Sequence, residues 1–522
     1  MLKKLHGRKL AVCLIGGAMY ALFSAFGWQA EHGGVIWAGG ALLVAALLVW
    51  PIAALLAVLL ERGYTRALRR EKTFRAGRAF AFMLACYVPM FCVAFPGSFA
   101  YDVPYQLRQV VTGAYSTHHP LLHTLALGGL LQLGRALGDI NLGAALYTAL
   151  QMALLAGCFA LTCGSIARQS GARAAKRAMV FFALYPLNMV MAVNATKDVL
   201  FGGFFALTLA LLNEMQEKPS RGLTMKIAAC GALAVMLRNN MAYAALVWLA
   251  ILTIGLRKAE KSAALAMLLA LAVGLCGNAA LKRATRAESG DMSEMLSWPI
   301  QQLARARLYD EERLTDAEKE AIDELMPGEA WACYDPTISD PVKFEFDTQA
   351  FRADVKKYVG VWLSVGKKCA GTYLDATMAL TYPFFYPYRE YRVSGYYVQM
   401  GMSDAYDAGW CDFDPPESRS LFPRALASLS WRFGAKGAMQ IPVVGWLFNM
   451  GVIVWTMLFF ALREMYWGRW RRFGTALLPV LLWGTFLLGP VMAGRYIYPF
   501  VCALPVLAAR PGRSVKEAER HG

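Results

Sequence analysis

The sequence predicts an all-α polytopic membrane protein with about 12 transmembrane helices and one mainly helical domain outside the membrane. Of the 522 residues, 57% are hydrophobic and only 17% are charged, whereas soluble domains carry about a quarter charged residues. The apolar residues form runs of roughly 17 to 26, long enough to cross about 30 Å of hydrocarbon as helices. The net charge of +17 lies mostly in short loops, which indicates positive-inside topology rather than nucleic-acid binding.

The long segment 282–436 has the opposite charge balance. It contains 24 acidic and 19 basic residues, whereas the rest of the chain is strongly basic. Because Lys and Arg mark cytoplasmic loops, we expect this segment to form an extracytoplasmic domain. It separates an N-terminal transmembrane module, 1–281, from the C-terminal transmembrane helices and cytoplasmic tail, 437–522.

The expected spans follow the apolar runs. In chain order they cover residues 10–28, 35–60, 79–95, 142–166, 178–194, 198–214, two spans within 226–257, 263–281, 440–462, 474–491 and 496–510. The first run resembles a signal peptide, but its cleavage signal near Ala30 is poor, so we expect an uncleaved span. Seven Lys or Arg residues in 61–78 place that loop in the cytoplasm. By the same charge rule, we expect a multi-pass protein of the cell membrane with both termini in the cytoplasm.

The region 226–257 decides the topology. It holds about 32 mostly apolar residues, interrupted by Arg238-Asn239-Asn240. A single crossing would place the later basic loop Arg463–Arg472 outside the cell, against the charge rule. We therefore expect two short or tilted helices, with Arg238 at the outer surface.

Ionisable side chains avoid the centres of the expected spans and gather at their outer ends. Charges near a bilayer are costly, so their position is informative about function. A proton-coupled transporter would place them near the midplane, whereas clustering at the outer ends suits a reaction at the outer leaflet on a lipid-held substrate. The cluster comprises Asp102, His118, His119, His123, Lys197, Asp198, Arg238 and Arg495.

The first outer loop, 96–141, carries two candidate features. Asp102 could take a proton from an acceptor hydroxyl as a general base, or could only cap a helix. In His118-His119-Pro120, proline suits a helix start, so the histidines border a helix N-terminus. They could donate hydrogen bonds to a phosphate there, or could be solvated loop residues.

Further candidates lie at the starts of later spans. Asp198 would complement the dipole at a helix N-terminus, which is a structural role. Lys197 is unfavourable at the same place unless it meets an anion. Arg495, followed by Tyr496, could clamp a lipid phosphate or anchor the span at the interface.

In chain order, these residues resemble the GT-C superfamily of membrane glycosyltransferases, which includes the protein O-mannosyltransferases and the lipid A aminoarabinose transferases. The shared order is an acidic residue in the first outer loop, a His-Pro-Leu stretch, an acidic residue opening a span, and Arg-Tyr-x-x-Pro opening a late span. A bacterial branch is the most similar, with Pro-Gly-x-Phe-x-x-Asp, His-His-Pro-Leu-Leu-His-Thr, Lys-Asp-Val-Leu-Phe and Leu-Arg-Asn-Asn. The resemblance covers roughly residues 80–260 and 475–510.

The resemblance implies transfer of a sugar from a polyprenyl-phosphate donor, with inversion, to a glycan, lipid or protein acceptor outside the cytoplasm. Asp102 matches the first-loop base, and Asp198 matches the second acidic residue, which orients substrate or a metal. His119 and Pro120 match the His-Pro pair. Arg495 matches the late arginine that faces the donor phosphate.

The leaving phosphate needs positive charge, for which the candidates in falling order are Lys197, Arg238 and Arg495, with His119 beside them. The predicted substrate-binding residues are His118, His119, Lys197, Arg238, Asn239, Arg495 and Tyr496. Many relatives have two adjacent acidic residues where Asp102 stands alone. No cofactor is therefore certain, and a divalent cation stays open.

The outer domain is expected to cover the site and select the acceptor. Its aromatic residues could stack on sugar rings or form a membrane-interface belt. They are Tyr382, Phe384, Phe385, Tyr386, Tyr388 and Tyr391. One disulfide could form among Cys333, Cys369 and Cys411, with the pairing open.

Two other functions are compatible with the sequence. A transporter or flippase of lipid-linked glycans predicts midplane charges and repeat symmetry, and neither is visible. A non-enzymatic envelope-assembly protein predicts that Asp102→Ala leaves activity in cells intact. The sugar, the acceptor, the lipid carrier and the oligomeric state stay open.

Overall fold

The chain is a helical membrane protein, as predicted. The computed structural model describes residues 5–32, 40–62, 74–100, 102–255, 258–290, 292–387, 398, 400–402, 415–433, 441 and 443–510. These residues form helices and isolated β-bridges, and no strand. Within them, six helices are long and apolar enough to cross a membrane: α1 (Arg8–His32), α2 (Gly40–Arg62), α3 (Ala76–Ala94), α6 (Ile140–Ser170), α9 (Lys197–Glu217) and α12 (Lys258–Thr285).

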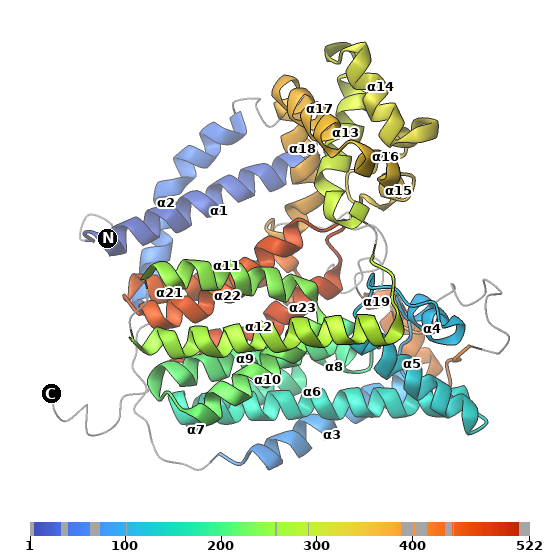
Figure 1. The fold of residues 1–522 in the computed structure, drawn as a ribbon. Coiled ribbons are helices and arrows are strands. Elements are labelled where there is room, and N and C mark those ends of the chain that lie inside the picture. Colours follow the sequence, from blue (N-terminus) through green and yellow to red (C-terminus); the bar gives the residue numbers. More distant parts are fainter. Residues whose placement is uncertain are drawn as a thin grey trace.

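Further helices pack beside these and run along the same bundle (Figure 1). They are α7 (Ala172–Leu184), α8 (Pro186–Ala192), α10 (Arg221–Leu237), α11 (Asn239–Gly255), α21 (Met450–Tyr466), α22 (Trp470–Leu487) and α23 (Tyr498–Ala508). The prediction of two helices in 226–257 is confirmed, because Arg238 is extended at φ −155° and ψ 117° between α10 and α11. The expected single helix over 178–194 is wrong. Tyr185 is extended before Pro186, whose ring disfavours a helical conformation in the preceding residue.

Contacts between helix ends place several basic loops at one end of the bundle. Lys9 at the start of α1 pairs with Glu61 at the end of α2 at 2.6 Å. Glu61 also accepts a hydrogen bond of 2.8 Å from Tyr466 at the end of α21. Arg472 at the start of α22 lies 3.1 Å from Glu217 at the end of α9. We call this end, which carries the loops after α2, α9 and α21, the basic end.

The opposite end of the bundle carries the polar residues singled out in the sequence, and we call it the site end. Because α9 has 21 residues, Lys197 at its start lies about 30 Å from its last residue. The segment 96–141 forms α4 (Val103–Thr112) and α5 (Leu121–Ala136) at this end. α5 turns back onto α6 where Gly134 meets Gly143, and a Cβ on Gly134 would lie 2.3 Å from Gly143 N.

A group of short helices stands apart from the bundle in Figure 1, and we call it the outer group of helices for that position alone. These are η2 (Met292–Leu296), α13 (Ser297–Tyr309), η3 (Glu311–Arg313), α14 (Asp316–Leu325), η4 (Pro327–Cys333), α15 (Asp340–Lys343), α16 (Thr348–Ala353), α17 (Val355–Lys368) and α18 (Ala370–Thr381). They enclose a hydrophobic core of their own, which includes Ile300, Ile322 and Val342. Trp298 Nε1 donates to the Leu487 carbonyl at 2.7 Å, so this group meets the bundle at the site end.

The remaining described helices are η5 (Tyr382–Phe384), α19 (Pro423–Phe433), η7 (Val444–Leu447) and η8 (Gly494–Ile497). Tyr382, Phe384, Phe385 and Tyr386 are each at most 5% exposed. Phe385 packs on Phe23 of α1 with ring centroids 4.9 Å apart. These four rings therefore form core, and neither of the two expected surface roles applies to them. Tyr388 and Tyr391 lie outside the described residues, as does Cys411. Cys333 and Cys369 are free thiols.

Candidate functional site

Backbone hydrogen bonds join the chain before α4 to the turn before α9. Ser98 N donates to Val193 O at 2.8 Å, and Ala195 N donates to Ser98 O at 2.8 Å. Gly97 has φ +144° and lies so close to Thr148 that a Cβ would sit 2.2 Å from the threonine hydroxyl oxygen. Only glycine permits this approach. The two backbone hydrogen bonds of Ser98 therefore hold the chain before α4 beside the chain before α9.

A buried series of side-chain hydrogen bonds supports this junction. Tyr147 donates its hydroxyl hydrogen to Gln151 Oε1 at 3.1 Å and therefore accepts from His123 Nε2 at 2.9 Å. His123 Nδ1 then accepts from Gln106 Nε2 at 3.0 Å. Gln151 Nε2 donates to two backbone carbonyls of the turn between α8 and α9, at 3.0 and 2.9 Å. This series ties α4, α5 and α6 to the turn that precedes Lys197.

Asp102 lies directly before α4 and is surrounded by cations. Lys197 Nζ donates to its Oδ2 at 2.7 Å. Arg495 Nη1 and Nη2 donate to Oδ2 and Oδ1, both at 3.2 Å. His119 Nδ1 lies 3.7 Å from Oδ2 and 3.5 Å from Lys197 Nζ. Three predicted site residues, each from a different segment of the chain, thus meet at the carboxylate of a fourth, Asp102.

The charges of this group follow from its surroundings. Burial alone would raise the pKa of Asp102, but the Arg495 guanidinium and the Lys197 ammonium outweigh it and hold the pKa well below its usual range. Burial lowers the pKa of His119 to about 3, against the opposing effect of Asp102. At neutral pH the group therefore holds one carboxylate, two cations and a neutral imidazole, a net single positive charge.

Asp198 forms a second, deeper ion pair with Arg238. The Asp198 side chain is 0% exposed and that of Arg238 is 9% exposed. Thr196 caps α9, and its hydroxyl also donates to Asp198 Oδ2 at 3.2 Å. The Arg238 guanidinium carbon lies 4.5 Å from the ring centroid of Tyr496, and Arg495 Nε lies 3.9 Å from Asp198 Oδ2. Asp198 is therefore placed to position the two arginines.

Two of the predicted site residues, His118 and Asn239, make no described contact with Asp102 or Asp198. His118 is exposed, and its Nδ1 is 4.0 Å from Glu294 of the outer group of helices. Glu294 in turn binds Lys343 Nζ at 2.7 Å, so His118 faces that group rather than Asp102. Asn239 is exposed at the first position of α11. The neighbouring Asn240 instead reaches inward and donates to the Thr485 hydroxyl at 3.2 Å.

The residues of the site offer few ligands of their own for a divalent cation. Hard cations such as Mg²⁺ and Ca²⁺ require several oxygen ligands. In the described part of the chain, no group of three or more His, Cys, Asp or Glu side chains could hold a metal ion. Both carboxylates of the site, Asp102 and Asp198, already face cationic side chains. The residues present therefore supply a carboxylate that can accept a proton and cations that can bind an anion.

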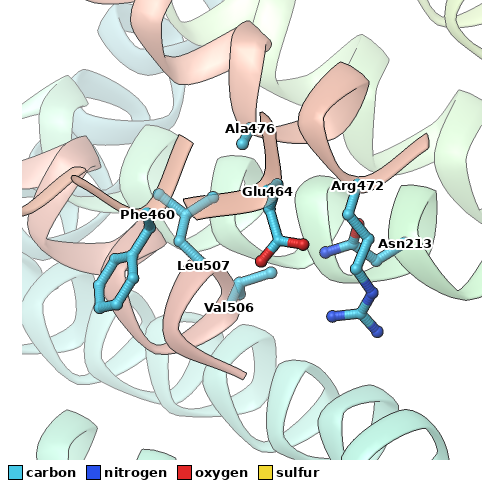
Figure 2. Close-up of a pocket in the computed structure, with 7 residues that line it drawn as sticks. All are labelled: Asn213, Phe460, Glu464, Arg472, Ala476, Val506 and Leu507. Atoms are coloured by element: carbon cyan, nitrogen blue, oxygen red, sulfur yellow. The ribbon is translucent and has the colours of Figure 1, made fainter. Parts of the chain in front are cut away.

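A separate small pocket lies at the basic end. Figure 2 shows its lining residues, which are Asn213, Phe460, Glu464, Arg472, Ala476, Val506 and Leu507. Glu464 accepts two hydrogen bonds from Arg463, at 2.9 and 2.6 Å. Arg472 donates to Glu217 at 3.1 Å. Because these residues lie near the far end of α9, the pocket is not part of the group around Asp102.

Comparison with known proteins identifies one family. The family described as "Family of unknown function (DUF6020)" matches residues 105–521, which is most of the chain. The chain belongs to this family. The matched region includes His119, Lys197, Asp198, Arg238 and Arg495, and it begins three residues after Asp102. No curated protein and no solved structure matches the chain.

Several residues of the site were not identified from the sequence. Tyr147 and Gln151 belong to no motif, although two polar residues four positions apart in an apolar helix were a usable signal. Thr196 likewise belongs to no motif singled out in the sequence, yet it caps α9. Phe486 lies under Arg238 at 4.4 Å, a contact across more than 240 residues that no local pattern predicts.

Proposed function

We propose that this protein is an inverting membrane glycosyltransferase of the GT-C type. It transfers a sugar from a polyprenyl-phosphate donor to a glycan, lipid or protein acceptor on the extracytoplasmic side of the cell membrane. The observation that carries the proposal is the contact of Asp102 with Lys197, Arg495 and His119. A carboxylate that can accept a proton there adjoins two cations that can hold a phosphate.

The proposed topology has about twelve crossings. Successive helices run alternately between the basic end and the site end, with α7 and α8 together making one crossing. The crossings are α1, α2, α3, α6, α7 with α8, α9, α10, α11, α12, α21, α22 and α23. Because basic loops stay in the cytoplasm, the basic end and both termini are cytoplasmic in this proposal. Residues 282–436 are then extracytoplasmic, between the ninth and tenth crossings.

The reaction is a single displacement at the anomeric carbon. The acceptor hydroxyl gives its proton to Asp102, and its oxygen attacks the face opposite the phosphate. A new carbon–oxygen bond forms while the bond to the phosphate oxygen breaks, so the configuration inverts. The bond pair leaves with the polyprenyl phosphate, whose added negative charge Lys197 and Arg495 stabilise. His119 is neutral and can donate or accept a hydrogen bond beside them.

Asp198 and Arg238 have a positioning role in this proposal. Their ion pair is too deeply buried to meet a substrate, but it lies within reach of Arg495. Fixing the plane of the Arg495 guanidinium matters because two parallel hydrogen bonds to a phosphate need a defined orientation. The transporter alternative gains no support, because the described charges stand at the helix ends rather than along a central path.

The test is a transfer assay in membranes that contain the overproduced protein. A panel of radiolabelled polyprenyl-phosphate hexoses and pentoses is supplied, and release of polyprenyl phosphate and labelling of envelope fractions are measured. The wild type should turn over one donor, and Asp102→Asn should reduce the rate by about 10²-fold or more. Asp139→Asn is the matched control, since Asp139 is another outer-loop carboxylate paired with an arginine, Arg419, at 2.6 Å. Equal product from wild type and Asp102→Asn would contradict the proposed function.

A further inference from the structure

Both oxygens of Asp102 are occupied by the cations that the proposed reaction needs for the donor. Oδ2 accepts from Lys197 and from one Arg495 nitrogen, and Oδ1 accepts from the other Arg495 nitrogen. A carboxylate with three charge-assisted hydrogen bonds is a weak base. The same residue thus has two incompatible tasks, neutralising the cations and accepting a proton.

We propose that Asp102 is an internal counter-ion that the donor phosphate displaces, so that donor binding itself releases the carboxylate to act as the base. This inference rests on the proposed function and adds an order of events to it. The acceptor hydroxyl can lose its proton only after a lipid-linked phosphate has taken over Lys197 and Arg495. Without a donor, the site holds no effective base.

The donor phosphate can displace Asp102 from its cations, but it cannot displace Asp198 from Arg238. The Lys197 and Asp102 side chains are 14% and 21% exposed, so both can be reached from outside the bundle. The Asp198 side chain is 0% exposed, and its partner Arg238 is covered by the rings of Phe486 and Tyr496. A buried pair of this kind does not exchange partners without leaving a charge unpaired. The phosphate therefore replaces Asp102 and leaves Asp198 paired.

A phosphate suits the two released cations. Arg495 already presents two nitrogens to two oxygens of one group, which is the geometry of a phosphate clamp. Lys197 adds a flexible point charge from the start of α9. Together they carry two positive charges, which outweigh the single negative charge of the donor phosphodiester and match the two charges of the polyprenyl phosphate monoester that leaves.

The proposal predicts that removing the carboxylate strengthens phosphate binding. The probe is farnesyl phosphate, titrated against the full-length protein in lipid nanodiscs, with farnesol as the control for binding of the chain alone. Asp102→Asn and Asp102→Ser should each lower the Kd for farnesyl phosphate about tenfold, because the internal competitor is gone. Lys197→Gln and Arg495→Gln should raise it by a similar factor. Asp139→Asn should leave it unchanged.

The outcomes separate this inference from the proposed function. If the wild type binds farnesyl phosphate but both Asp102 variants bind it equally or more weakly, the counter-ion proposal is overturned and the glycosyltransferase proposal stands. If the wild type binds farnesyl phosphate no better than farnesol, both are overturned, since the site then does not recognise the lipid phosphate. Using two variants of different size ensures that a folding defect in one does not decide the result.

Discussion

Asp198 and Arg238 form an ion pair in the interior of the protein, at the site end of the bundle. Asp198 lies in the first turn of α9 and Arg238 directly follows α10, and their side chains are 0% and 9% exposed, respectively. A buried charge is tolerated only when its partner is present, so each residue fixes the other. The pair therefore holds two helix ends together beneath Arg495.

Asp198→Asn should destabilise the protein by about 3–5 kcal/mol, because it leaves the Arg238 charge buried without its partner. The measurement is thermal unfolding of the purified protein in detergent. The double variant Asp198→Asn with Arg238→Met should recover part of the loss. Glu214→Gln is the control, since its partner Arg168 is 55% exposed, and it should cost about 1 kcal/mol or less. An Asp198→Asn protein that melts with the wild type would contradict the structural role.

Tyr147→Phe tests the buried hydrogen bonds that support the turn before α9. The substitution leaves His123 Nε2 and Gln151 Oε1 without their partner and should cost about 1–3 kcal/mol. Hydrogen exchange of backbone amides in 192–196 should become faster. Tyr105→Phe, at a tyrosine that is 56% exposed on α4, should change neither quantity. Unchanged exchange in Tyr147→Phe would show that the turn is held by other contacts.

Glu318 should make the outer group of helices sensitive to acid. Burial would raise its pKa, but hydrogen bonds from Lys368 at 2.7 Å and from Thr315 N at 2.9 Å outweigh this and lower the pKa to about 2. The unfolded chain binds the proton more readily, so the contribution is complete above the ordinary value of 4.5 and is lost as the pH falls towards 2.

Thermal unfolding of wild type and Glu318→Gln between pH 7 and pH 3 measures this contribution. The wild type should be more stable by about 2 kcal/mol at pH 7, and the difference should shrink below about pH 4.5. Glu324→Gln is the control, because Glu324 pairs with Lys357 at a site where both side chains are 41% exposed. A difference between wild type and Glu318→Gln that does not change with pH would refute the ionic explanation.

The sequence predicted best what depends on local patterns. Apolar runs predicted the helices of the bundle. The charge rule predicted the division of 226–257, because a single crossing would have placed the basic loop Arg463–Arg472 outside the cell. The break before Pro186 was missed, although the restriction that proline imposes on Tyr185 is also local.

The geometry of the site was predictable only in part. That Asp102, Lys197 and Arg495 belong together followed from their shared place at the outer ends of spans. Which carboxylate each cation meets depends on packing between distant helices, and no local pattern encodes it. For the same reason the sequence did not separate His119, which points inward to Asp102, from His118, which faces Glu294.

The proposed sugar transfer requires the site end to lie on the extracytoplasmic side of the membrane. Cys333 is exposed on the outer group of helices, and it provides a native probe. A membrane-impermeant maleimide applied to intact cells should label the wild type at Cys333 and should not label Cys333→Ser there. In the Cys333→Ser background, Arg471→Cys at the exposed start of α22 should react only after the membrane is permeabilised. Labelling of Arg471→Cys in intact cells, with Cys333 protected, would contradict the account.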